Sequence, residues 1–263
     1  MTAPQYLSNI KFVKDISDSN GNIVHCYYLT NSFDEKTLQE WAHRIRCEYV
    51  SDKTIERLTS DGIDVDDFLN NRIPKSDNNR GCVIISGDFS ELLMTDFREF
   101  ILKESAFRGK LQSKPTPNSP IQGCDILTYR IDGTDASKDQ LIITEAKSLI
   151  SSTNYEVILK AASDSEKDST RIGETLAFLL DFFSNRGNED DYKKILRFTK
   201  KGESTFVEEF EASGLTVCCC LEESNITNVL KQIKTTQKNI YFVYGKDLKN
   251  LAYDLYRRAL NDK

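Results

Sequence analysis

Two carboxylates and a lysine stand at the ends of two β-forming runs, and they are the residues of this sequence best suited to chemistry. Asp125 begins the first run, and Glu145 and Lys147 flank an alanine at the end of the second. Magnesium is typically bound by one or two carboxylates with several waters retained. A lysine beside such an ion can orient a water or neutralise developing charge. Together these groups suit the hydrolysis of a phosphodiester bond.

The elements that carry these residues are expected to bring them together. The runs at 124–131 and 140–145 are joined by a charged, glycine-containing loop, which favours an antiparallel hairpin. The start of the first strand then lies beside the end of the second, so that Asp125 and Glu145 can share one ion. Side chains alternate along a strand, so Glu145 and Lys147 project to the same side.

An upstream helix supplies a further carboxylate. Residues 89–103 contain no glycine or proline and predict a helix, preceded by a short apolar strand at 82–85. Apolar residues occupy most of the circumference of this helix, which indicates a central, largely covered position. Glu91 can hold a metal-bound water or a second ion there. Asp88, one turn earlier, is the rival for that role.

Each short motif also has a simpler interpretation. A Glu-x-Lys triplet on an exposed strand is more often a solvated face or a weak ion pair, and an aspartate after a glycine often belongs to a turn. The joint occurrence of Glu91, Asp125, Glu145 and Lys147, in this order on these elements, favours a metal centre.

These residues resemble the motifs of the PD-(D/E)XK nuclease superfamily. Gly123-Cys-Asp125 matches its aspartate element and Glu145-Ala-Lys147 its ExK element, with Cys124 in place of the proline. The resemblance implies a restriction-endonuclease-like core, in which a mixed β-sheet is flanked by helices. More narrowly, residues 81–263 resemble the HamA family, the nuclease subunits of the bacterial Hachiman anti-phage defence system. That resemblance rests on three runs, at 86–93, 123–127 and 143–148.

The resemblance also implies roles and partners. Asp125 and Glu145 become ligands of Mg²⁺ or Mn²⁺, Lys147 the catalytic lysine and Glu91 the helix carboxylate. The family usually carries glutamate where this chain has Asp88, a shorter side chain. The implied activity is that of an endodeoxyribonuclease with little sequence preference for its DNA. A helicase subunit like HamB is implied as a partner that restrains the nuclease until damaged or invading DNA is sensed.

The length and composition fit a soluble globular protein with an α/β (α+β) fold. The 263 residues suit one large domain or two packed lobes, which we place at 1–80 (an N-terminal αβ lobe) and 81–263 (the nuclease core). No apolar run approaches the roughly 20 residues of a membrane helix, so we expect a cytoplasmic bacterial protein without membrane contact. The elements expected outside the candidate site are strands at 23–29, 215–221 and 240–244 and helices around Trp41 and at 65–69, 156–162, 170–183, 192–201, 225–233 and 248–260.

Cysteine and histidine are expected to take no part in the chemistry. The seven cysteines are odd in number and lack CxxC spacing, so we predict neither a disulfide framework nor a zinc site. Cys218, Cys219 and Cys220 are predicted to lie in a buried strand. Only His25 and His43 are present, and we find no cysteine–histidine pair in the sequence, so a thiol or serine triad has few possible bases.

The charge distribution leaves a second class of function open. The formal net charge of −6 argues against nonspecific coating of nucleic acid by the whole surface. A basic helix at 192–201 can be a solvated face or a contact for DNA or a partner. A loop near 108–114 can guide a phosphate strand to the metal or simply carry scattered surface charge. A non-catalytic module that docks on a helicase or on DNA is therefore the alternative. The basic residues concerned are Lys193, Lys194, Arg197, Lys200 and Lys201 in the helix and Arg108, Lys110 and Lys114 in the loop.

Overall fold

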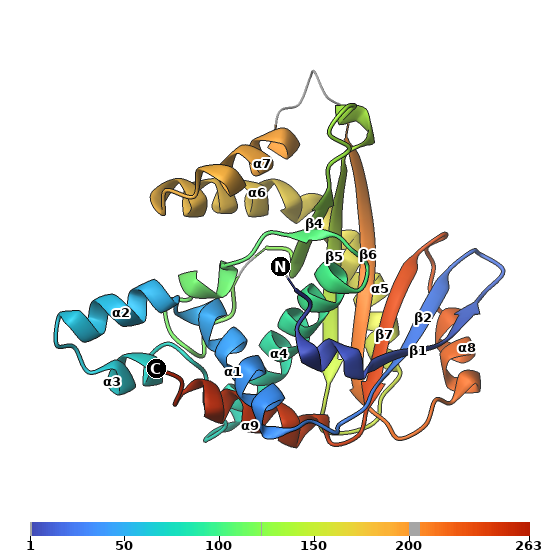
Figure 1. The fold of residues 1–263 in the computed structure, drawn as a ribbon. Coiled ribbons are helices and arrows are strands. Elements are labelled where there is room, and N and C mark those ends of the chain that lie inside the picture. The colour runs from blue at the N-terminus through green and yellow to red at the C-terminus, as the bar shows by residue number, and fades with distance from the viewer. Residues whose placement is uncertain (1, 122, 200–205) are drawn as a thin grey trace.

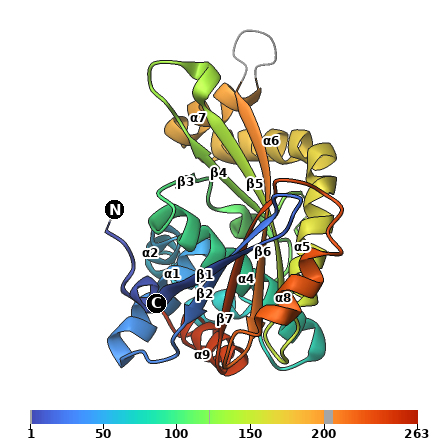
Figure 2. The same cartoon turned by 90° about the vertical axis from the view of Figure 1, so that its right-hand side faces the viewer.

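A seven-stranded mixed sheet forms the centre of the computed structural model, which describes residues 2–121, 123–199 and 206–263 (Figures 1 and 2). The strand order is β1-β2-β7-β6-β5-β4-β3. Strands β2, β7, β6 and β5 run parallel to one another, whereas β1, β4 and β3 are antiparallel to their neighbours. The strands are β1 (Ile10–Ser17), β2 (Ile23–Leu29), β3 (Ser105–Ala106), β4 (Ile126–Arg130), β5 (Gln140–Leu149), β6 (Val207–Val217) and β7 (Asn239–Gly245).

Helices cover both faces of this sheet, which confirms the predicted α/β (α+β) class. Helices α1, α4 and α9 share one apolar core on one face, and α5 and α8 belong to a second core on the other. Helices α6 and α7 pack against β4 and β5 in a third cluster. No helix of the described residues is long and apolar enough to cross a membrane. The helices are α1 (Glu35–Tyr49), α2 (Asp52–Ser60), α3 (Val65–Asn70), α4 (Asn79–Phe100), α5 (Glu156–Asp164), α6 (Asp168–Asn185), α7 (Glu189–Thr199), α8 (Glu223–Leu230) and α9 (Leu248–Ala259).

Helix α4 is the central helix expected from the sequence, but it is longer and begins earlier. The prediction of a strand at 82–85 is wrong, because these residues form the first turns of α4. The side chain of Asn78 caps the helix by accepting a hydrogen bond from the Gly81 N–H at 2.8 Å. Ile85, Phe89 and Leu93 then follow at four-residue spacing and are all buried. That helical period outweighs the β propensity of the Cys-Val-Ile-Ile run.

Strand β6 departs from the expected run at 215–221. It begins at Val207, and Glu208 is exposed at its start, so its first half lacks the apolar pattern of a buried strand. It ends at Val217. Cys218 is buried, but Cys219 and Cys220 are exposed, so the prediction that all three lie in a buried strand is wrong.

The first 80 residues share the sheet and a core with the rest of the chain. Strand β2 pairs with β7 in parallel, and the ring of Trp41 in α1 stacks on Tyr6 with centroids 4.0 Å apart. The ring of Phe89 in α4 lies 5.7 Å from Trp41. Trp41 is therefore a core residue. Asp34 caps α1 by accepting a hydrogen bond from the Thr37 N–H at 2.7 Å.

Candidate active site

The β4–β5 hairpin brings Asp125 and Glu145 face to face, as the sequence predicted. Ile126 pairs with Thr144 in the antiparallel ladder, so Asp125 and Glu145 stand opposite each other one position further along. Asp125 Oδ2 accepts a hydrogen bond from the Ala146 N–H at 2.9 Å, which ties the end of one strand to the other. Directly opposed residues of an antiparallel pair share one face of the sheet.

The turn before Asp125 depends on glycine. Gly123 has φ +101°, a conformation that side chains with a Cβ adopt only with strain. A Cβ at this position would also lie 2.6 Å from Thr175 Oγ1 in α6. The same hydroxyl accepts a hydrogen bond from the Cys124 N–H at 2.9 Å. Helix α6 thus fixes the backbone that presents Asp125.

Glu145 and Lys147 project to the same side of β5 and touch each other. Lys147 Nζ donates to Glu145 Oε1 and lies 3.2 Å from Asp164 Oδ2. Burial raises the pKa of Glu145 to about 7, and the negative charge of Asp125 adds to the shift. Burial lowers the pKa of Lys147, but the hydrogen bond to Glu145 and the negative charges of Glu145 and Asp125 together outweigh this and hold the pKa above its usual value. Lys147 is therefore an ammonium ion at neutral pH.

The two candidate helix acids occupy different surroundings. Asp88 is buried, and its carboxylate accepts hydrogen bonds from the Tyr49 hydroxyl and from the ammonium of Lys114. Glu91 lines both a narrow cavity and an open groove together with Asp125. Its carboxylate lies 3.6 Å from Lys110 Nζ. The geometry favours Glu91 over Asp88 as the helix carboxylate of this site.

The Glu91 carboxylate lies in a cavity where the ammonium of Lys110 partly offsets the negative charge of Asp125. Burial raises its pKa to about 8, the charge of Lys110 opposes the shift, and the charge of Asp125 adds to it. Lys110 Nζ also donates a hydrogen bond to the Cys124 carbonyl at 2.8 Å. Lys110 therefore links Glu91 of α4 to the backbone of the turn before Asp125. The sequence had grouped it only with the basic loop.

Asp168 is a further acid of this site that the sequence did not reveal. It is the first residue of α6, its side chain has no exposed surface, and neither carboxylate oxygen accepts a hydrogen bond from the residues described. Arg171 Nη1 lies 3.8 Å away. Burial raises the pKa of Asp168 to about 6, with a contribution from Asp125. No motif marks Asp168, because its proximity arises from the packing of α6 on the hairpin.

The residues present fit a hard divalent cation. Glu145 Oε2 is buried without a hydrogen-bond partner in the described chain, as are both oxygens of Asp168. The negative charge of Asp125 contributes to the raised pKa values of Glu145 and Asp168, and a bound cation would relieve this repulsion. Within the described residues, no three of these acids bring ligand atoms within 4.8 Å of one another. The set therefore suits an ion that takes one or two carboxylates and keeps its waters.

A groove leads from these acids to the surface. Glu91, Asp125 and Lys147 line it together with the polar side chains of Ser86 and Ser148. Lys249 of α9 also stands at its wall. The groove thus joins the acids to the positive side chains of Lys147 and Lys249, an arrangement suited to an anionic polymer.

The loop cations are engaged in ion pairs within the fold. Arg108 Nη1 contacts Glu48 at 2.7 Å, and Arg108 also pairs with Asp96 and Glu99. Lys114 is buried against Asp88. Neither side chain is free to guide a phosphate strand, so that interpretation of Arg108 and Lys114 is wrong.

A comparison with protein families identifies the family to which the chain belongs. A model of the HamA family matches residues 4–259, nearly the whole length. The chain belongs to the HamA family. It is therefore a component of a Hachiman defence system, and the sequence resemblance, first seen over residues 81–263, extends through the N-terminal lobe as well. No curated protein matches this HamA-family chain.

Proposed function

We propose that this HamA-family protein is a Mg²⁺-dependent DNA endonuclease that cleaves phosphodiester bonds with little sequence preference. The observation that carries the proposal is the opposition of Asp125 and Glu145 across the hairpin, with Lys147 beside them and a buried Glu145 oxygen left without a partner. Mn²⁺ is expected to replace Mg²⁺, because both prefer carboxylate and water ligands.

Asp125 and Glu145 would hold the cation, with Glu91 at the mouth of the cavity able to hold a metal-bound water or a second ion. Bound there, the ion supplies charge stabilisation on the phosphoryl oxygens and a more acidic water. Lys147, protonated beside Glu145, can donate a hydrogen bond to the scissile phosphate and stabilise the negative charge that develops on it. A water oxygen would bond to phosphorus as the bond to the leaving sugar oxygen breaks; the attacking water would lose a proton to solvent, and the leaving sugar oxygen would take a proton from solvent to become a hydroxyl.

DNA is the proposed substrate and a helicase subunit like HamB the proposed partner. Hachiman membership supports both, and the groove between Lys147 and Lys249 offers a path for a strand. The net charge of −6 supports delivery to DNA by a partner, since nonspecific attraction of the whole surface is weak.

A plasmid assay tests the activity. Purified protein, alone and with its helicase subunit, is incubated with supercoiled plasmid and Mg²⁺ or Mn²⁺, and nicked and linear products are measured. Lys147→Ala and Asp125→Ala should each lower the cleavage rate by at least about 100-fold, a typical cost of losing one charge-stabilising group. Lys160→Ala, on the exposed side of α5, is the matched control and should cleave normally. Cleavage that persists in EDTA or in Lys147→Ala would contradict the proposal.

The alternative is a module that docks without cleaving, and α7 is the surface to examine. Ile195 and Phe198 pack inward, and Lys193 is exposed. Lys194 and Arg197, however, pair with Asp191 and Asp139 at 3.0 and 2.5 Å. Lys200 and Lys201 lie outside the described residues. The basic face of the described helix is thus partly neutralised.

Two variants separate the alternatives. If Lys193→Glu abolishes co-purification with the helicase subunit while Asp125→Ala leaves phage protection intact, the docking module is favoured. If Asp125→Ala abolishes protection but keeps the complex together, the nuclease is favoured.

A further inference from the structure

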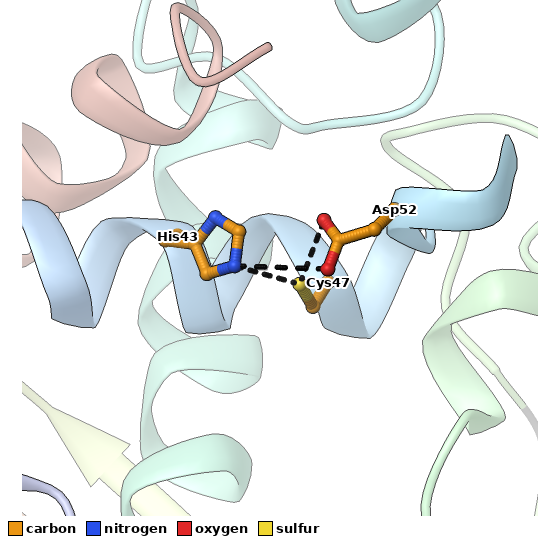
Figure 3. A group of neighbouring side chains, drawn as sticks. All are labelled: His43, Cys47 and Asp52. Atoms are coloured by element: carbon orange, nitrogen blue, oxygen red, sulfur yellow. Dashed lines mark hydrogen bonds and ion pairs between the residues drawn. The ribbon is translucent and has the colours of Figure 1, made fainter. Parts of the chain in front are cut away.

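Three potential metal ligands meet on the surface of the N-terminal lobe, away from the hairpin acids. His43 and Cys47 lie on adjacent turns of α1, and Asp52 is the first residue of α2 (Figure 3). Cys47 Sγ lies 3.6 Å from His43 Nε2 and 3.7 Å from Asp52 Oδ1, and His43 Nε2 lies 3.8 Å from Asp52 Oδ2. The expectation of no cysteine–histidine pair is therefore wrong, because residues four apart share one face of a helix.

These separations match one face of a tetrahedral zinc site. With Zn–S near 2.3 Å and Zn–N and Zn–O near 2.0 Å, tetrahedral ligand atoms lie about 3.3–3.6 Å apart. The two separations from Cys47 Sγ, to His43 Nε2 and to Asp52 Oδ1, exceed that range by at most one or two tenths of an ångström. His43 Nε2 lies 3.8 Å from the other oxygen of Asp52, Oδ2, so one carboxylate oxygen must turn toward the ion to serve both neighbours. Among the described residues, this is the group in which three such ligand atoms lie within 4.8 Å of one another. Small rotations of the exposed His43 and Asp52 side chains about the half-buried Cys47 would close the site.

The surrounding groups orient the ligands. His43 Nδ1 lies 2.8 Å from Asp262 Oδ2, so Nδ1–H can donate to that carboxylate and leave the Nε2 lone pair facing Cys47. A carboxylate behind the ring is the usual way in which a zinc-binding histidine is held. Arg46 Nη2 lies 3.1 Å from His43 Nδ1 but, as a donor, cannot bond to that nitrogen in the tautomer whose Nδ1–H donates to Asp262. Arg46 donates instead to Asp52 and Asp262, which fixes the two carboxylates relative to α1.

We propose that His43, Cys47 and Asp52 bind a divalent cation of the zinc class, with the fourth position open to water. A thiolate, an imidazole and a carboxylate prefer Zn²⁺ to the Mg²⁺ of the candidate active site. The thiolate and the two carboxylates carry three negative charges, and Arg46 cancels one of them. The bound ion would join α1 to α2 and, through Asp262, to the segment that follows α9.

Binding of the ion would displace a proton. Burial raises the pKa of Cys47 to about 11, which keeps the metal-free thiol protonated at neutral pH. A metal ligand must be deprotonated, so affinity should increase as pH rises from 6 to 8.

Cobalt is the probe, since Co²⁺ occupies zinc sites and its spectrum reports its ligands. Reduced protein in excess Mg²⁺, which competes for the all-oxygen site, is titrated with Co²⁺. We expect a thiolate-to-cobalt charge-transfer band and the visible bands of tetrahedral Co²⁺, saturating at one ion per chain and lost on addition of Zn²⁺. Zn²⁺ should also raise the thermal unfolding midpoint.

Variants assign the bands to this site. Cys47→Ser and His43→Gln should each remove the charge-transfer band and the Zn²⁺ stabilisation, and Asp262→Asn should weaken Co²⁺ binding by about 10–100-fold. Cys82→Ser is the matched thiol control, and a Cys219→Ser, Cys220→Ser double variant controls for the exposed thiol pair. Both controls should keep the band. Absence of the band in the parent protein, its survival in Cys47→Ser or its loss in the Cys219, Cys220 variant would overturn the proposal.

Discussion

The protonation state of Glu145 links the stability of the protein to metal binding at the candidate site. Its pKa in the fold is about 7, above the usual glutamate value, because it is buried beside Asp125. The folded state therefore binds this proton more tightly than the unfolded state. The stabilisation is fully present below the unfolded pKa and is lost as pH rises through the folded value. The same sign holds for Glu91 and Asp168.

The first prediction is that stability falls as pH rises, because the pKa of Glu145 is raised in the folded state. In EDTA, the free energy of unfolding should fall between pH 6 and pH 8, and Mg²⁺ should restore it at pH 8 by binding the ionised carboxylates. Glu145→Gln, which mimics the protonated acid, should reduce the fall by on the order of 1 kcal/mol. Urea unfolding at both pH values measures this. Glu189→Gln, exposed on α7, is the control, and an equal pH dependence in Glu145→Gln and the parent would contradict the prediction.

Asp168 should affect metal binding and stability in opposite directions. Asp168→Asn removes a buried negative charge that lacks a hydrogen-bond partner in the described chain, so the metal-free protein should become more stable. The loss of that charge beside Asp125 should raise the Mg²⁺ concentration for half-maximal cleavage by about 10–100-fold. Cleavage titrations and thermal unfolding in EDTA measure the two effects. Asp181→Asn, exposed on the same helix, should change neither.

At the scale of elements, the turn before Asp125 depends on the packing of α6. Gly123→Ala adds a Cβ that meets Thr175 Oγ1 at 2.6 Å in a backbone of positive φ. Gly133→Ala introduces positive-φ strain in open space. Gly123→Ala should therefore lose about 1–3 kcal/mol more stability than Gly133→Ala, which is the usual cost of overpacking. It should also cleave more slowly, because Asp125 is displaced. Equal losses in urea unfolding would show that α6 does not constrain the turn.

The hairpin was predictable because its determinants are local. Two β-forming runs and a glycine-containing loop fix which residues oppose each other, and so Asp125 and Glu145 could be paired from the sequence. The strand expected at 82–85 failed for the opposite reason. Its apolar run is compatible with a strand or with the start of a helix, and the choice depends on Ile85 continuing a stripe that packs against distant residues.

The rest of the site depends on packing that no local pattern encodes. Asp168 reaches the acids because α6 lies across the hairpin, and Lys114 is buried because Asp88 and Tyr49 surround it. His43 and Cys47 had a readable four-residue spacing, but Asp52 joins them only through the bend between α1 and α2. Spacing identifies ligands on one element, whereas ligands from several elements require the fold.

At the scale of the whole molecule, one sheet and one core connect the two lobes expected from the sequence. Strand β2 pairs with β7 along its full length, and Trp41 of α1 packs in the same apolar core as Phe89 of α4. Buried charge adds to this connection, because Asp96 of α4 binds Arg44 of α1 at 2.6 Å. A connection of this kind leaves little independent stability to residues 1–80.

We therefore expect the protein to unfold as one cooperative unit. Trp41 is the single tryptophan and lies in the N-terminal lobe, so its fluorescence reports that lobe, whereas far-ultraviolet circular dichroism reports the whole chain. The two urea transitions should coincide. Phe89→Ala, a core change in α4, should lower both midpoints together through a loss of about 3–5 kcal/mol. A Trp41 transition that stays in place while the circular dichroism midpoint falls would instead establish an N-terminal lobe that folds by itself.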